Sequence, residues 1–362
     1  MHDTHVSLAH GNGGRRMREL IDAVFARHLG NPDLDTAADA VSIVIPTGNA
    51  GTQCQEWRQY SSAGTGEIIV TTDGFTVQPL VFPGGDIGSL AIHGTANDLA
   101  VVGATPLYFT LSAFIEEGLS IDRLERIVAS MARAAQGIDA RVVAGDTKVV
   151  RREEGGGIYF AMTGIGARPP GTRLGMARIE EGDAILVSGP VGDHGIAVLL
   201  AREEFDLQGD PQSDTAHVLP IARAFLPLPG LRFMRDPTRG GLATVAHEIC
   251  RGTGFSVRLE QSAIPVRDSV RTVCEILGYD PLYLACEGRI VIVIGPEQAD
   301  EALAVCRAVE GGGETARIGT IQAMARQADA RQTALQQVIV ETEFGGERIL
   351  EELEDDPLPR IC

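Results

Sequence analysis

Long apolar segments are missing from this sequence of 362 residues. Its longest apolar runs, such as Ile290–Ile294, are far shorter than the roughly 20 residues that a membrane-spanning helix needs. The first residues, Met1–His5, are polar and lack the basic and apolar regions of a secretion signal. We therefore expect no membrane span and no secretion signal, and we expect a cytoplasmic location.

Basic residues are also scarce. The sequence has 31 lysines and arginines against 49 aspartates and glutamates, which gives a formal net charge of −18. A surface of this sign repels the phosphate backbone of nucleic acids. Nucleic acid is therefore not expected as a partner.

Cysteine occurs at only six positions, and no two of them form a Cys-x-x-Cys pair. This argues against a disulfide framework and against a zinc site, so we expect reduced thiols. Burial does not explain Cys54, which lies in a polar stretch, or Cys362, the last residue. For the other four, burial of a small apolar side chain is the ordinary explanation: Cys250, Cys274, Cys286 and Cys306.

The residues that are present have a globular composition, with 44% hydrophobic and 22% charged residues. The length suits two domains better than one. The best candidate boundary is Arg168–Gly171, which contains two prolines. We therefore expect an N-terminal domain at 1–170, an α+β domain at 171–346 and a flexible acidic tail at 347–362.

Helical and strand patterns alternate irregularly along the chain, which favours two α+β domains over a doubly wound parallel sheet. Apolar spacing and capping residues predict helices at 17–29, 89–102, 121–136, 194–204, 240–250, 268–277 and 297–309. Strands are predicted at 68–72, 107–114, 141–144, 158–165, 184–188, 255–259 and 290–294. Residues 46–66 are polar and resemble a long surface loop.

Neither a Walker A segment nor a Gly-x-Ser-x-Gly elbow is present. The chain instead has aspartates in segments rich in glycine, threonine or asparagine. Three have such a residue as a direct neighbour, and the fourth, Asp236, begins the sequence Asp-Pro-Thr-Arg-Gly-Gly; the other three are Asp73, Asp98 and Asp146. Carboxylate oxygens suit Mg²⁺, and neighbouring glycines let backbone N–H groups approach phosphate, so aspartates that meet at one point can hold Mg–nucleotide. Taken singly, each is equally explained as part of a common turn dipeptide.

The order of the longer motifs is the most specific signal. They are Thr72–Pro79, Phe82–Gly88, Gly94–Ala100, Ile115–Gly118, Ala144–Val150, Arg235–Gly241, Glu287–Arg289 and Pro359–Cys362. In that order and spacing they closely resemble the HypE family of hydrogenase maturation proteins. This family is a branch of the ATP-binding superfamily of aminoimidazole ribonucleotide synthetase and selenophosphate synthetase. The resemblance covers roughly residues 8–45 and 67–362, and the Pro-Arg-Ile-Cys ending distinguishes this branch.

The resemblance implies a PurM-like two-domain ATP-binding fold with a flexible C-terminal tail, and it makes residues 1–170 the ATP-binding and dimerisation domain. It also implies a reaction: a partner carbamoyltransferase, HypF, places a carboxamide on the Cys362 sulfur. The protein then uses ATP and Mg²⁺ to dehydrate this group to a thiocyanate, which supplies the cyanide ligand of a [NiFe]-hydrogenase iron. An iron-carrying HypC–HypD complex is the implied recipient. A homodimer with shared ATP sites is implied as well.

The resemblance also assigns roles to residues. The implied catalytic residues are Cys362, Glu287 and Lys148, and we favour Glu287 over Lys148 as the base that takes the amide proton. The alternatives are a phosphate clamp for Lys148 and an ordinary surface ion-pair partner for Glu287. Asp39 is a weaker nucleotide-binding candidate. The implied nucleotide-binding residues are Asn12, Gly13 and Gly14 as a lid, with Asp73, Asn97, Asp98, Asp146, Thr147 and Asp236. The implied Mg²⁺ ligands are Asp73, Asp98 and Asp146.

Two departures from the family pattern stand out. Residues 46–66 are longer than the usual connection, and His93 stands where a small residue or cysteine is expected; we expect it to be a packed or surface residue. Two other functions stay open. One is a small-molecule kinase or synthetase of the selenophosphate synthetase type, which leaves Cys362 without a role. The other is a non-enzymatic scaffold whose acidic tail binds a basic partner.

Overall fold

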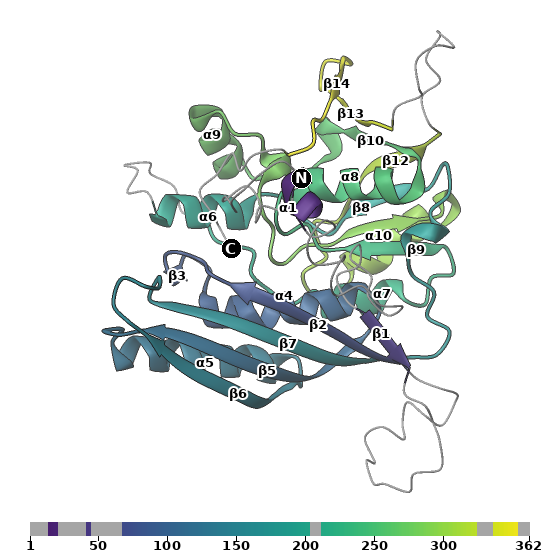
Figure 1. The fold of residues 1–362 in the computed structure, drawn as a ribbon. Coiled ribbons are helices and arrows are strands. Elements are labelled where there is room, and N and C mark those ends of the chain that lie inside the picture. The colour runs from purple at the N-terminus through teal and green to yellow at the C-terminus, as the bar shows by residue number, and fades with distance from the viewer. Residues whose placement is uncertain (1–13, 21–40, 45–66, 203–210, 324–335, 354–362) are drawn as a thin grey trace, which may run out of the picture.

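Two β-sheets, one in each half of the chain, organise the computed structural model (Figure 1). The structure describes residues 14–20, 41–44, 67–202, 211–323 and 336–353. A short helix, α1 (Arg15–Leu20), precedes the first sheet. Of the helices in these ranges, none combines the length and apolarity that crossing a bilayer requires.

The first sheet has five strands in the order β1-β2-β7-β5-β6. All neighbours are antiparallel except β5 and β6, which are parallel and are joined by a helix, as a parallel pair requires. A small separate ribbon, β3 (Val81–Phe82) with β4 (Gly85–Asp86), leads into the first long helix. The strands of the sheet are β1 (Val41–Val44), β2 (Glu67–Phe75), β5 (Thr105–Glu116), β6 (Arg141–Val150) and β7 (Ile158–Arg168).

Two helices pack together on this sheet. In α5 (Ile121–Gly137) the Ser120 hydroxyl accepts a hydrogen bond from the Arg123 N–H, and every fourth residue along one stripe is buried. Helix α4 (Ile87–Val101) is capped at its N-terminus by the carboxylate of Asp86, which accepts from the Gly88 and Ser89 N–H groups. It is buried on nearly all sides because it lies between the first sheet and the second half of the chain, where it contacts α7 and β9.

The second sheet has seven strands in the order β14-β13-β10-β12-β8-β11-β9. Only β10 and β13 are parallel neighbours among these described strands. Its central strands β8 and β11 are buried along their whole length. The strands are β8 (Ala184–Val187), β9 (Leu231–Arg235), β10 (Ser256–Glu260), β11 (Val291–Ile294), β12 (Ala316–Gln322), β13 (Val338–Glu341) and β14 (Glu347–Ile349).

Helices cover both faces of this sheet. Ile185 and Val187 of β8 share one apolar core with α8, whereas Ala184 and Leu186 share another with α7 and α10. This alternation follows from the two-residue period of a strand. The helices of this half are α6 (Asp193–Arg202), α7 (Leu219–Phe225), α8 (Gly241–Thr253), α9 (Asp268–Leu277) and α10 (Ala299–Arg307), with short 3₁₀ turns at Met176–Arg178, Gln261–Ala263, Pro281–Tyr283 and Pro296–Gln298.

The prediction of two α+β units, and not a doubly wound parallel sheet, is confirmed, and most neighbouring strands in both sheets are antiparallel. The four cysteines expected to be buried are buried and free of disulfides. The predicted helix at 268–277 has the observed bounds, but α7, β9 and the three C-terminal strands were not predicted. The residues of α7 and β9, Leu219–Phe225 and Leu231–Arg235, form short apolar stretches without a clear period, so their pattern alone does not identify them.

Two predicted boundaries were wrong. Strand β6 does not end at Ala144 but continues to Val150, so Asp146 lies within a strand rather than in a turn. The tail does not begin at 347, because β14 pairs with β13 and Leu350 is fully buried. The acidic charge at Glu352 is paired with Arg18 and Arg251, which explains why an acidic stretch packs here.

Candidate active site

Two acidic residues leave the second sheet at the same end. Strand β9 ends at Arg235, whose register partner on the antiparallel strand β11 is Val291, the first residue of that strand. Asp236 therefore follows β9 at the point where the segment containing Glu287 enters β11. Both side chains are buried, with 6% and 4% of their surface exposed. Burial argues against the alternative that Glu287 is an ordinary surface ion-pair partner.

The loop after β9 is held against this segment. The Cys286 N–H donates to the Pro237 carbonyl oxygen over 3.0 Å. Gly241, with φ +59°, sits so close to the 282–284 backbone that a Cβ atom would lie 2.5 Å from the Leu284 carbonyl oxygen. A side chain at 241 would force the two loops apart, so glycine here keeps Asp236 and Glu287 in one place.

The first sheet and its helix supply the opposite wall. Asp73 lies near the end of β2, and its carboxylate accepts a 2.7 Å hydrogen bond from the Gly74 N–H. Asp98 lies on α4, which packs against β2, and its carboxylate accepts a 2.7 Å hydrogen bond from the Thr71 hydroxyl. The site therefore forms only where the two halves of the chain meet.

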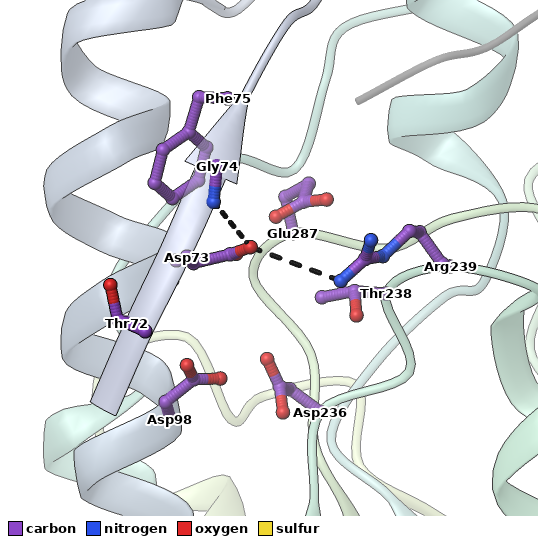
Figure 2. Close-up of a pocket in the computed structure, with 10 residues that line it drawn as sticks. Thr72, Asp73, Gly74, Phe75, Asp98, Asp236, Thr238, Arg239 and Glu287 are labelled. Carbon is purple, nitrogen blue, oxygen red and sulfur yellow. Dashed lines mark hydrogen bonds and ion pairs between the residues drawn. The ribbon is translucent and has the colours of Figure 1, made fainter. Parts of the chain in front are cut away.

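These four acidic side chains line one pocket (Figure 2). Asp98 and Asp236 face each other across it, and Glu287 and Arg239 lie at the end where Asp73 points. The Arg239 guanidinium lies 3.8 Å from the Asp73 carboxylate. The ten residues lining the pocket are Thr72, Asp73, Gly74, Phe75, Gly94, Asp98, Asp236, Thr238, Arg239 and Glu287.

Burial and mutual repulsion of the negative charges raise the pKa values of acidic side chains in this site. Burial, and then the neighbouring Asp73 and Glu248, raises the pKa of the Asp236 carboxyl to about 6. Burial also raises the pKa of Asp73, against the opposing pull of Arg239. The pKa of Glu287 lies well above its ordinary value, because of burial and the charges of Asp214, Asp236 and Asp73. A site of this kind binds protons or cations readily.

Mg²⁺ suits these oxygen ligands. In the described part of the chain, no three acidic, histidine or cysteine side chains converge into a complete metal-ligand set. Mg²⁺ is commonly held by one or two carboxylates together with nucleotide phosphates and water. The spaced carboxylates of Asp73, Asp98 and Asp236 fit that mode better than a closed protein cage.

Asn97 does not line the pocket, although it was predicted as a nucleotide ligand. Its amide nitrogen donates to the carbonyl oxygens of Ala216 and Glu287 over 3.0 and 3.1 Å, and its amide oxygen accepts from the Val218 N–H over 2.8 Å. The side chain is 1% exposed. Its polar groups are therefore used to join α4 to the second half of the chain.

Asp146, Thr147 and Lys148 also lie outside this pocket. They are on β6, the last strand of the first sheet, and are exposed. Strand β6 is separated from β2 by β7 and β5, which corresponds to about 14 Å across the sheet. Within one chain, the structure does not bring these residues to Asp73 and Asp98.

Other predicted positions have mixed outcomes. Gly14 is buried at the start of α1 and is not one of the residues that line the pocket, while Asn12, Gly13, Asp39 and Cys362 lie outside the described residues, as do 46–66. His93 lies on α4 with its ring 5.9 Å from that of His217, and burial lowers its pKa to about 4. It does not line the pocket, as expected.

Sequence reasoning missed several lining residues. Thr238 and Arg239 belong to the same motif as Asp236, and Phe75 lies two residues after Asp73. The motifs were recognised, but no function was predicted for these three residues. Gly94 lines the pocket, and a Cβ atom there would lie 3.1 Å from the Phe75 ring. Its position one turn before Asp98 on α4 was the available signal.

The end of the described chain lies beside the site. The Leu353 carbonyl oxygen accepts from the Arg15 N–H over 3.4 Å. A Cβ atom on Gly240, the residue after Arg239, would lie 3.6 Å from the Leu353 side chain. Leu353, the last described residue, therefore lies next to the loop that carries Asp236 and Arg239.

Comparisons with known proteins agree with this arrangement. Residues 59–167 match the family model "AIR synthase related protein, N-terminal domain", and residues 180–328 match the corresponding C-terminal domain. The chain is 42% identical to the hydrogenase expression/formation protein HupE of Azotobacter chroococcum and 41% identical to the carbamoyl dehydratase HypE of Azotobacter vinelandii. Each match covers 99% of this chain and 97% of the relative. The chain belongs to the HypE family.

Solved structures of HypE proteins have the same fold. A structure of a HypE–HypF complex matches with a TM-score of 0.80 and 36% identity, covering 92% of this chain and 99% of that one. A HypE structure in complex with ATP matches with a TM-score of 0.77 and 39% identity, covering 99% and 100%. The PurM-like two-domain fold expected from the sequence is therefore confirmed.

Proposed function

We propose that this chain is an ATP-dependent carbamoyl dehydratase of hydrogenase maturation that acts on a carboxamide carried by its own Cys362. The observation that carries this proposal is the buried Glu287 in one pocket with Asp73, Asp98 and Asp236, in a member of the HypE family. The product, a thiocyanate on Cys362, supplies the cyanide ligand of the hydrogenase iron. The kinase and scaffold alternatives give no role to Cys362 in catalysis.

ATP is the phosphoryl donor in this proposal, and the bound nucleotide in a related HypE structure supports it. Asp73, Asp98 and Asp236 are the residues placed to hold Mg²⁺ with the triphosphate, and Arg239 adds a positive charge beside them. The metal would neutralise charge that develops on the transferred phosphoryl group. Gly74, which has no neighbouring atom in the space where a Cβ would lie, leaves room for the phosphates to approach the backbone.

The reaction balances in two steps. The amide oxygen attacks the γ-phosphorus, an O–P bond forms, and ADP leaves with the electron pair of the broken P–O bond. The carbon–oxygen bond then breaks as phosphate departs, and the nitrogen loses both of its protons. The sulfur-bound carbon is left triple-bonded to nitrogen. This chemistry needs a base beside the amide nitrogen.

Glu287 is our choice for that base. It is buried in the pocket, and its raised pKa makes its carboxylate a stronger base than an ordinary one. The charges that raise its pKa come from Asp73, Asp214 and Asp236, so cations bound at the pocket would favour its ionised form. Lys148 is not in this pocket within one chain and would reach it only from a second copy.

A homodimer would bring β6 to a second chain. Among the described strands, β6 is an outer strand of the first sheet, and it exposes Val142, Val143 and Val149 along that edge. An exposed strand edge of this kind pairs readily with another chain. We propose this edge as the dimer interface, with Asp146 and Lys148 serving the site of the partner.

The C-terminal tail delivers the substrate. Nine residues beyond Leu353 span about 30 Å when extended, which lets Cys362 reach a separate protein and return to the pocket. The proposed donor of the carboxamide is the carbamoyltransferase HypF, supported by the solved HypE–HypF complex of a relative. The HypC–HypD complex is the proposed acceptor of the cyano group, on the family resemblance.

The test is the intact mass of the full chain incubated with the carbamoyltransferase, carbamoyl phosphate and Mg–ATP. We expect the mass of one carboxamide to be gained and one water then to be lost. The variant Glu287→Gln should gain the carboxamide and bind Mg–ATP but lose water roughly a hundredfold more slowly. Loss of water at the native rate would remove Glu287 as the base and favour Lys148. A wild-type chain that never loses water would refute the proposed function.

A further inference from the structure

The segment at 211–218 joins both halves of the chain beside the pocket. The Ser213 N–H donates to the Pro83 carbonyl oxygen over 2.9 Å, and the Ser213 hydroxyl lies 2.8 Å from the His194 ring nitrogen. Further along, Ala216 and Val218 bind the side chain of Asn97 on α4. The segment is therefore fixed to the β3–β4 ribbon, to α6 and to α4.

Asp214, in the middle of this segment, binds the backbone that carries Glu287. Its carboxylate accepts from the Glu287 N–H over 3.0 Å and from the Gly288 N–H over 3.3 Å. The Asp214 side chain has no exposed surface. Two backbone donors on one buried carboxylate leave residues 287 and 288 little freedom to move.

Gly288 permits this close approach. A Cβ atom on Gly288 would lie 1.9 Å from the Asp214 carbonyl oxygen, so no other residue fits without moving the segment. The charge of Asp214 is compensated by Arg289, whose guanidinium lies 3.4 Å from its carboxylate and 3.6 Å from that of Asp193. Within the Glu287-Gly288-Arg289 motif, the first residue thus lines the pocket, the second allows the close approach and the third supplies the countercharge.

We propose that Asp214 is a positioning residue for Glu287. By holding the 287 and 288 N–H groups, its carboxylate fixes the point from which the Glu287 side chain enters the pocket. A base must lie within hydrogen-bond reach of the proton it takes, and a displacement of about 1 Å can cost up to a hundredfold in rate. This inference rests on the proposed role of Glu287.

The variant Asp214→Asn tests it. Asparagine keeps the size but offers one oxygen for two N–H donors, and its own NH₂ group would face the second donor. The measurement is the intact mass of the pre-carbamoylated chain as a function of time after Mg–ATP is added. We expect the loss of water to slow roughly ten- to a hundredfold. The dissociation constant of Mg–ATP should change less than about threefold, because Asp214 does not line the pocket.

Asp183→Asn is the matched control. Asp183 is also a buried aspartate that accepts from a backbone N–H, that of Glu180, and lies near an arginine, Arg232, but it is not part of the pocket. Its variant should dehydrate at the native rate. Equal slowing in both variants, a native rate in Asp214→Asn, or a parallel loss of Mg–ATP binding would each overturn the inference.

A milder variant covers the case in which Asp214→Asn does not fold. Ser213→Ala removes the hydroxyl that contacts His194 and Thr215 but leaves Asp214 intact. Water loss should slow severalfold with Mg–ATP binding retained, and a native rate would contradict the inference. A native rate in Glu287→Gln refutes the role of Glu287 as the base. A native rate in Asp214→Asn beside a slow Glu287→Gln refutes only the positioning role of Asp214.

Discussion

Removing the buried charge of Asp236 should stabilise the protein in the absence of Mg²⁺ and nucleotide. In Asp236→Asn the side chain keeps its size but cannot ionise. The pKa of Asp236 rises from 3.8 to about 6 in the folded protein because of burial and the neighbouring acidic groups. The folded chain therefore holds a proton at pH values where the unfolded chain has already released it, so ionisation weakens folding.

The magnitude follows from the shift in pKa. A rise from 3.8 to about 6 corresponds to about 3 kcal/mol of folding free energy, which is lost progressively as pH rises through the range of about 4 to 6. Asp236→Asn does not bear this cost. Its advantage over the native chain should be about 1.5 kcal/mol at pH 5 and about 3 kcal/mol at pH 8.

Urea unfolding of both chains at pH 5 and pH 8, without divalent cations, measures this advantage. Glu125→Gln is the control, because Glu125 is exposed on α5 and its removal should leave stability unchanged at both pH values. The electrostatic account of the site would be refuted by an Asp236→Asn chain no more stable than the native one at pH 8. An advantage equal at both pH values would refute it as well.

Three further predictions concern the metal, the tail and the second copy. Asp98→Asn keeps an acceptor for the Thr71 hydroxyl but loses the anionic ligand. Calorimetric titration should therefore show Mg–ATP binding at least roughly tenfold weaker, with little change in the melting temperature measured without nucleotide. An unchanged affinity would remove Asp98 from the site. Deleting Cys362 should abolish carboxamide gain in the mass spectrum but leave Mg–ATP affinity native, and loss of nucleotide binding would contradict a free tail. Val149→Asp should dissociate the proposed dimer in sedimentation experiments, whereas Val128→Asp, at an exposed position of α5, should not; a dimer that survives Val149→Asp places the interface elsewhere.

The local sequence patterns and the sequences of the motifs predicted the acidic residues that face one another. Each belongs to a segment with a specific sequence, and in the folded chain all of them line one pocket: Asp73, Asp98, Asp236 and Glu287. The burial of Glu287 was not predictable, because no pattern around Glu287-Gly288-Arg289 indicates which side of the loop faces the core. The same limit applies to Asp214, which has no glycine or motif beside it and acquires its role from a contact 73 residues away.

Contacts between distant segments explain the remaining differences. Asn97 and Asp98 are adjacent, yet successive helix positions point in different directions, so one joins the second half of the chain while the other lines the pocket. Strand β6 was predicted too short because Gly145 interrupts its pattern, although pairing with β5 carries the strand onward. The packed residues 347–353 reflect the pairing of β14 with β13, which the acidic sequence concealed.

The burial of α4 on nearly all sides bears on how the molecule comes apart. Separating the two halves would expose its apolar surface to water and exchange the three backbone hydrogen bonds of Asn97 for bonds to water, at a net cost of about 0.5–1.5 kcal/mol for each bond. Neither half is then a self-sufficient folding unit, although each matches its own family model. Scanning calorimetry of the full chain should record one cooperative endotherm, and a fragment ending near Arg168 should aggregate through the face of α4 that the second half normally covers.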